Sequence, residues 1–213
     1  MYKRNAGFVA KLDIFYRNKI LDKIKISSSK TRTTLILDRC QTLKKTIVIE
    51  FNNIEKLQKL GFVGFKNVAE LNNNPNLLPN QMGVYLVLNL SDNKTEFLTK
   101  GVGGFFKGKD PNISIAELEN NWVKNCKTIY IGKAGGLNGN ATLRSRLKQY
   151  LKFGQGKNIG HYGGRLIWQL KNHLDLTFCW LPMTDIEPRE LEKKLLAEFI
   201  NQYGQRPFAN LTG

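Results

Sequence analysis

Short apolar runs alternate with segments of helical periodicity over residues 83–203, and loops rich in glycine separate them. The runs 83–90, 128–131 and 174–181 have the length and the β-branched and aromatic content of buried strands. The segments 142–151 and 188–203 repeat apolar residues every three or four positions, which indicates helices, and Ser114 with Glu117 forms a capping box for another. Alternation of this kind predicts an α/β domain.

The first 80 residues are organised differently. Apolar residues at helical spacing predict a helix over 8–24, strands are expected over 35–37 and 46–51, and a helix over 53–60. The polar loop 27–34 contains Lys30 and Arg32, which are candidates for phosphate contacts, although a plain linker has the same composition. The asparagine- and proline-rich loop 72–81 is the expected boundary. We therefore expect a basic accessory region over 1–80 and a second domain over 81–213.

The charge of the chain favours a polyanionic partner. Lysine and arginine number 33 against 17 acidic residues, which gives a net charge of +16. The first 50 residues carry twelve basic and four acidic residues, half of that excess. DNA is the expected partner, and an anionic membrane surface is the competing one, but no basic amphipathic helix suited to it is evident.

The sequence also predicts the cellular compartment of the protein. No apolar stretch approaches the roughly 18 to 20 residues of a membrane span, and the N-terminus does not resemble a signal peptide. The three cysteines, Cys40, Cys126 and Cys179, are widely spaced and form no C-x-x-C pair, which argues against a disulfide framework or a zinc site. A cytoplasmic location is expected.

Several polar residues occur in an ordered series across the second domain. Tyr85 lies in the strand triplet Gly-Val-Tyr, and Tyr130 opens the triplet Tyr-Ile-Gly, which Lys133 follows. Arg146 and Tyr150 lie one turn apart on the helix 142–151. The series ends with the helical Glu198, then Pro207 and Asn210.

This series resembles the GIY-YIG nuclease superfamily over residues 83–213. The resemblance implies a small central mixed β-sheet flanked by helices, and a GIY-YIG-type endonuclease that hydrolyses phosphodiester bonds in DNA. It implies Mg²⁺ as cofactor, with Mn²⁺ as a substitute. The first triplet is GVY rather than GIY, and the two tyrosines lie 45 residues apart, so residues 91–127 are interpreted as an insertion.

The resemblance also implies roles for individual residues. Glu198 is expected to hold the metal, because Mg²⁺ often takes only one or two protein carboxylates. Glu192 is its rival on the same helix, and Arg144 is the decoy for Arg146, which is expected to bind a phosphate oxygen. One of the two triplet tyrosines is expected to activate or orient water, and the sequence does not say which.

Five further residues complete the candidate site. Asn210 is expected to orient phosphate or to brace the site, and Tyr150 shares the helix face of the arginine. His161 is a candidate for proton transfer or phosphate contact, and an ordinary loop histidine is an equal alternative. Lys107 and Lys109 are candidate DNA contacts, with solvated loop lysines as the alternative.

The leading expectation is thus a metal-dependent DNA endonuclease. The first alternative is a nucleic-acid-binding module that keeps the GIY-YIG fold without turnover. The second is a basic protein that binds anionic membranes. The sequence leaves the biological role, the DNA specificity and the oligomeric state open.

Overall fold

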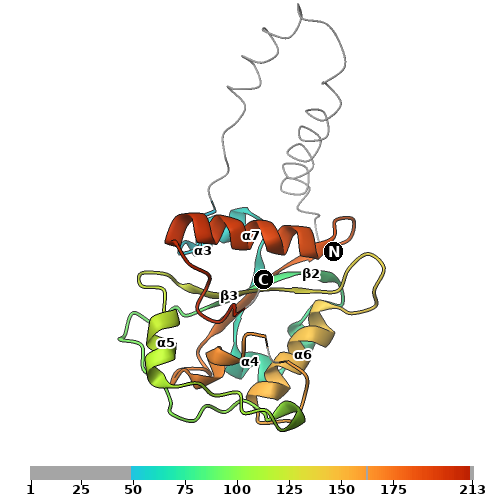
Figure 1. The fold of residues 1–213 in the computed structure, drawn as a ribbon. Helices are drawn as coiled ribbons and strands as arrows, with labels where there is room; N and C mark the ends of the chain where they lie inside the picture. Colours follow the sequence, from blue (N-terminus) through green and yellow to red (C-terminus); the bar gives the residue numbers. More distant parts are fainter. Residues whose placement is uncertain (1–48, 162, 212–213) are drawn as a thin grey trace, which may run out of the picture. The chain divides into compact units, whose positions relative to one another are not determined.

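The computed structural model describes residues 49–161 and 163–211, and Glu50 begins a compact unit that contains nearly all of them (Figure 1). The expected helix 8–24, the strand 35–37 and the loop with Lys30 and Arg32 lie outside the described residues. The expected strand 46–51 lies partly outside them, and its described end, 49–51, is loop and turn.

Four strands form the central sheet: β1 (Val63–Asn67), β2 (Met82–Leu88), β3 (Thr128–Ala134) and β4 (Thr177–Met183). Their order is β1-β4-β2-β3, and each pairing is antiparallel. The α/β class is confirmed, but the expectation of a mixed sheet is wrong for the described residues. Strands β2, β3 and β4 are buried along almost their whole length, so their sequences are continuous apolar runs rather than alternating ones.

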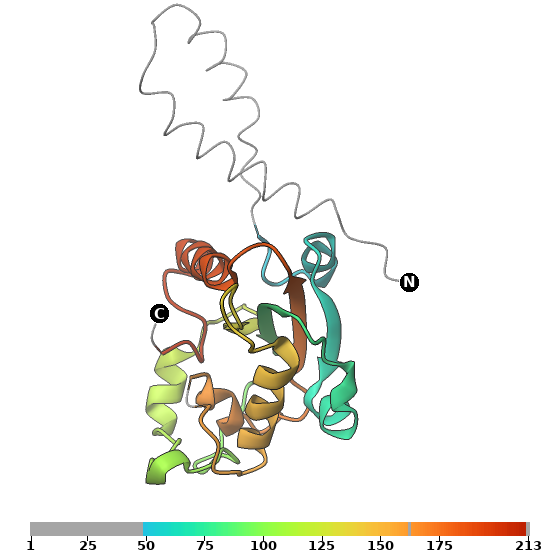
Figure 2. The same cartoon turned by 90° about the vertical axis from the view of Figure 1, so that its right-hand side faces the viewer.

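Five α-helices surround the sheet in the described part of the chain: α3 (Ile54–Lys59), α4 (Val68–Asn73), α5 (Ile115–Asn121), α6 (Leu143–Gly154) and α7 (Pro188–Tyr203). Short 3-10 helices lie in the connections: η2 (Pro75–Leu77), η3 (Phe106–Gly108) and η4 (Arg165–Gln169). Helix α7 covers one face of the sheet and α6 lies on the other (Figures 1 and 2). The main core on the α6 side contains Tyr85, Tyr130 and Phe178 from the strands.

Capping residues mark the starts of three helices. Ser114 and Glu117 form the capping box of α5, and the side chain of Thr142 caps α6. Pro188 occupies the first turn of α7, and Gly204 ends that helix with φ +72°. These local signals fixed the helix boundaries to within a few residues.

Strand β1 and helix α4 were not expected, and they move the domain boundary. Strand β1 pairs with β4, so residues from Glu50 onward belong to the same unit as the second domain, and the boundary expected near residue 80 is corrected to 49/50. The pairing of β1 contains an irregularity between Val63 and Lys66, where Gly64 has φ +96°. A Cβ at Gly64 would lie 2.4 Å from the ring of Trp180. This distorted strand lacks the period-two pattern by which strands are recognised in sequence.

The segment 91–127 packs into the same core. It pairs with the rest of the unit through an isolated bridge between Phe97 and Leu170. Gln169 of η4 holds the segment, because its amide donates to Leu98 O and Ile113 O and accepts from the Ile113 N–H.

Candidate active site

The tyrosines of the two triplets lie diagonally across neighbouring strands. Tyr85 on β2 is opposite Gly132 of β3, and Tyr130 is opposite Val87. Their ring centroids are 5.9 Å apart. A Cβ at Gly132 would lie 2.6 Å from Cζ of Tyr85, so the glycine makes room for the ring of Tyr85 to reach the outer edge of the sheet. The two tyrosines, which lie 45 residues apart in the sequence, are therefore neighbours in the structure.

Tyr150 and His161 extend this group below the sheet. Tyr150 comes from α6, with its ring centroid 5.7 Å from that of Tyr130. Its hydroxyl donates a hydrogen bond to Gly164 O, and His161 stacks on its ring at 3.9 Å. Tyr85, Tyr130, Tyr150 and His161 are called the tyrosine cluster below, and all four are buried.

Burial dominates the acid–base chemistry of the tyrosine cluster. It raises the pKa of all three phenols and lowers the pKa of His161 well below its usual range, so all four groups are neutral at pH 7. The nearby phenol of Tyr130 further raises the pKa of Tyr85, and the charge of Arg146 lowers the pKa of both. The pKa of Tyr85 is raised further than that of Tyr130, so Tyr130 is the phenol that loses a proton more readily.

Arg146 on α6 supplies the positive charge beside the tyrosine cluster. Its guanidinium makes no hydrogen bond or ion pair within the described residues, and it is only partly buried. Its charge nevertheless acts on each member of the cluster, lowering the pKa of Tyr85, Tyr130, Tyr150 and His161. An unpaired guanidinium with five donors can bind a phosphate oxygen. By contrast, Arg144 donates to Leu78 O at 2.8 Å and to Asn76 O at 3.3 Å, so it is used to hold the loop before β2.

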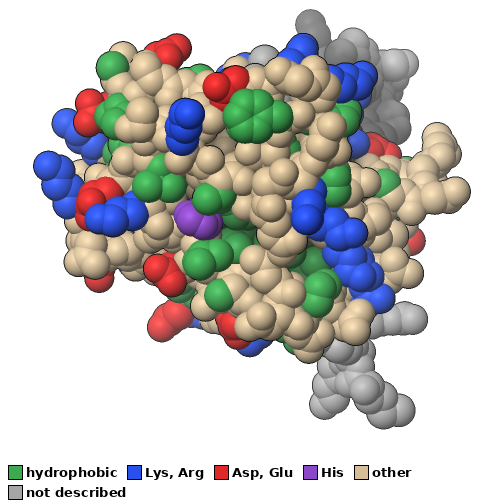
Figure 3. Space-filling view, turned by 90° about the horizontal axis from the view of Figure 1, so that it is seen from below, with side chains coloured by type: hydrophobic (Ala, Val, Ile, Leu, Met, Phe, Trp, Pro, Cys, Tyr) green, Lys and Arg blue, Asp and Glu red, His purple; other side chains and the backbone are tan. Residues whose placement is uncertain are grey.

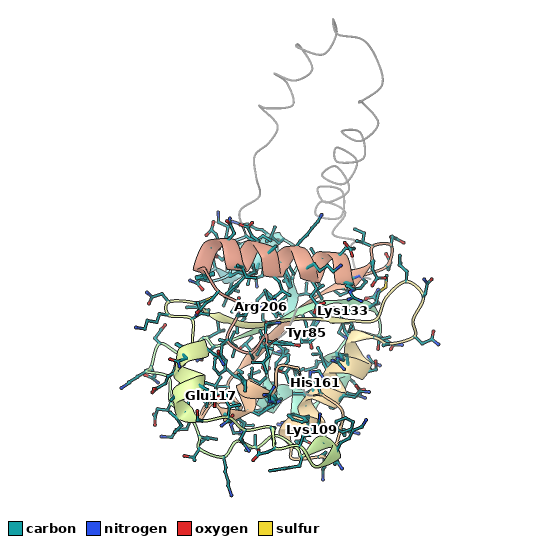
Figure 4. All side chains as sticks on the ribbon, viewed as in Figure 1. Tyr85, Lys109, Glu117, Lys133, His161 and Arg206 are labelled. Carbon is teal, nitrogen blue, oxygen red and sulfur yellow. The ribbon has the colours of Figure 1, made fainter. Side chains whose placement is uncertain are left out.

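Glu192, in the second turn of α7, is a carboxylate whose charge acts on this cluster. Burial raises its pKa, while the charges of Lys133, Arg189 and Arg146 lower it. The charge of Glu192 raises the pKa of both Tyr85 and Tyr130. Lys133 follows the second triplet on β3 and donates to Gly135 O at 3.1 Å. In Figure 4, Lys133, Tyr85 and His161 lie one below another beneath α7.

The expected metal ligand, Glu198, lies elsewhere on α7. Its carboxylate accepts a hydrogen bond from Gln202 Nε2 at 2.8 Å. Six residues separate Glu198 from Glu192, so at about 100° per residue the two carboxylates leave the helix about 120° apart. They flank opposite edges of the apolar arc that contains Leu191, Leu195 and Phe199. The structure brings Glu192, rather than Glu198, to the tyrosine cluster and Arg146.

Asn210 braces the outer edge of β3. Its Oδ1 accepts from the Ile131 N–H at 2.9 Å, and its Nδ2 donates to Ile131 O at 2.8 Å. The backbone of Ala209 bonds to Ile129 O, so the C-terminal segment covers this edge up to the residue before Gly132. Of the two expected roles of Asn210, the structure supports the bracing one.

Glu187 is a positioning residue that the sequence analysis did not single out. It caps α7, and its Oε2 accepts from the Leu137 N–H at 3.0 Å. The backbone N–H of Leu137 lowers the pKa of Glu187 more than any other group does. Glu187 thereby ties the loop that follows Lys133 to the helix that carries Glu192. Its position just before Pro188, at the start of the predicted helix, was the available signal.

The two candidate DNA contacts Lys107 and Lys109 are exposed in and beside η3, outside the helix α6 that carries Arg146. No helix among the described residues is long and apolar enough to cross a membrane. Comparisons with protein-family models, with curated proteins and with solved structures found no match for this chain.

Proposed function

We propose that this chain is a metal-dependent DNA endonuclease of the GIY-YIG type. The observation that carries the proposal is the guanidinium of Arg146, which has no partner within the described residues while its charge acts on the tyrosine cluster and on Glu192. A partly exposed cation beside phenols and a carboxylate suits a scissile phosphate, whose developing charge needs a fixed cation. The net charge of +16 supports a polyanionic substrate.

The donor set fits a magnesium ion with few protein ligands. Within the described residues no group of three or more His, Cys, Asp or Glu side chains gathers, which disfavours a cage of the zinc type. One carboxylate is enough for Mg²⁺, which fills its other positions with water and phosphate oxygens. Glu192 would hold the ion in this site, and Glu198 is the competing ligand. Bound Mg²⁺ would polarise the phosphate and acidify a water molecule.

The other catalytic roles belong to residues of the chain itself. Arg146 binds a non-bridging phosphate oxygen. Tyr85, whose pKa burial raises well above its usual range, keeps its proton and packs beside Tyr130. Tyr130 positions the attacking water, and a cation nearby favours its ionised form. Glycines 163 and 164 pack against the ring and hydroxyl of Tyr130, which limits water on that side.

The test is relaxation of supercoiled plasmid by the full chain in Mg²⁺ and in EDTA. We expect nicking in Mg²⁺ alone. Arg146→Ala should lose at least 100-fold in rate, the scale seen when one group that stabilises transition-state charge is removed. Lys148→Ala, which removes a cation from the same helix, is the matched control and should cut at close to the wild-type rate. Wild-type protein that binds the plasmid without nicking it would favour the binding-module alternative.

A further inference from the structure

An exposed phenylalanine lies among lysines in the segment 104–109, which we call the Phe105 loop. The side chain of Phe105 is 52% exposed, whereas the adjacent Phe106 is half-buried. Phe106 packs against Gly160, where a Cβ would lie 3.1 Å from its ring. One phenylalanine therefore anchors the Phe105 loop, and the other points into solvent.

The backbone of the Phe105 loop is held in place by its neighbours. The Gly104 N–H donates to Phe153 O at 2.9 Å, and the Lys107 N–H donates to Asn158 Oδ1 at 3.3 Å. Lys107 has φ +54°, an unfavourable angle for a residue with a Cβ, which the surrounding contacts maintain. The exposure of Phe105 thus belongs to a defined loop conformation. Asn158 belongs to the loop that carries His161, so the Phe105 loop adjoins the candidate active site.

The surroundings of Phe105 are basic. Lys107 and Lys109 lie in the Phe105 loop, and Lys157 lies in the loop that packs against Gly104; all three are exposed. The nearest acid in sequence, Asp110, accepts two hydrogen bonds from Asn112. Figure 4 places Lys109 near the lower end of α6, and Figure 3 shows a row of basic side chains on the face seen from below.

We propose that the Phe105 loop binds single-stranded DNA by stacking Phe105 on an unpaired base while the lysines contact the adjoining phosphates. This inference rests on the proposed function, because it takes DNA as the substrate. An aromatic ring beside cations is the arrangement by which proteins bind single strands, since any base offers a flat face for stacking. Intact duplex hides those faces, and phenylalanine has no hydrogen-bonding group to read a base edge. The preferred substrate is therefore DNA with an unpaired segment.

Binding measured without cleavage tests the proposal. The full chain is titrated in EDTA into a thymidine oligonucleotide with one 2-aminopurine, used as a single strand and as a duplex. We expect Phe105→Ala to weaken single-strand binding about 5- to 140-fold, the contribution of one stacked base, and duplex binding less than about twofold. Phe105→Trp should keep the affinity and the quenching of 2-aminopurine. Leu174→Ala, which trims another exposed apolar side chain, should change neither.

The outcomes separate this proposal from the proposed function. Equal affinities of wild type and Phe105→Ala for the single strand would overturn it, and so would equal losses on both substrates or no binding at all. Phe105-dependent single-strand binding by a protein that never cuts DNA would support the stacking role and reject the nuclease. Cleavage by wild type together with normal binding by Phe105→Ala would reject the stacking role alone.

Discussion

Asn210→Ala should destabilise the protein more than any exposed asparagine substitution, because it uncovers the backbone of an edge strand. Strand β3 is the last in the sheet, and the Asn210 amide pairs with both the N–H and the C=O of Ile131. Ile131 is fully buried and Asn210 is 8% exposed, so water does not easily replace the amide. An unsatisfied buried polar group costs about 1–3 kcal/mol, so the two together cost about 2–5 kcal/mol, with some relief from relaxation.

Urea unfolding followed by tryptophan fluorescence measures this loss. With a slope of about 2 kcal/mol per molar urea, the midpoint should fall by about 1–2.5 M while the slope itself stays unchanged. Asn201→Ala, on the exposed surface of α7, is the control and should stay within about 0.5 kcal/mol of wild type. The amide of Ile131 should also exchange its hydrogen faster in Asn210→Ala. A loss below about 1 kcal/mol, with protection at Ile131 unchanged, would refute the bracing role.

Two other predictions concern the arginines of α6 and the buried His161. Arg144→Ala should lower the free energy of unfolding in urea by about 1–3 kcal/mol, because the guanidinium bonds two loop carbonyls. Arg146→Ala should lower it by less than about 0.5 kcal/mol. Equal losses would show that the two helix positions were misread. Burial lowers the pKa of His161, so its unfolded form takes up a proton first as the pH falls through about 6.5, and folding stability is lost below that pH. His161→Phe keeps the stacking and should flatten the stability–pH curve between pH 7 and 5; an unchanged curve would contradict this account.

Much of the fold could be predicted because its signals are local. Strand β2 and helix α7 have clear periodicity, and Thr142 and Ser114 mark helix starts with side chains that bond to the next turn. Strand β1 could not be predicted in this way, because its form depends on the ring of Trp180, which lies more than 100 residues away in sequence. The antiparallel direction of every described pairing likewise follows from tertiary connections rather than from any local pattern.

The same contrast between local patterns and tertiary packing applies to the candidate site. Tyr85 and Tyr130 could be placed together from their strands, and Arg146 could be distinguished from Arg144 by helix face. The resemblance selected Glu198 over Glu192 as the metal ligand, and the sequence alone could not test that choice, because it depends on how α7 is rotated against the sheet. Both glutamates border the apolar arc of the helix, and periodicity alone does not tell which edge faces the tyrosine cluster.

The most direct test of the account compares Glu192→Gln with Glu198→Gln in plasmid cleavage at fixed Mg²⁺. Both variants should stay folded. Burial raises the pKa of Glu192, so its ionised form opposes folding above that pKa. Glu192→Gln should therefore be at least as stable as the wild type at pH 7. We predict that the wild type nicks DNA in Mg²⁺ and not in EDTA, that Glu192→Gln falls to background, and that Glu198→Gln retains most of the rate. Loss of cleavage in Glu198→Gln with normal cutting by Glu192→Gln would contradict the site described here, and full cutting in EDTA would contradict the metal-dependent mechanism.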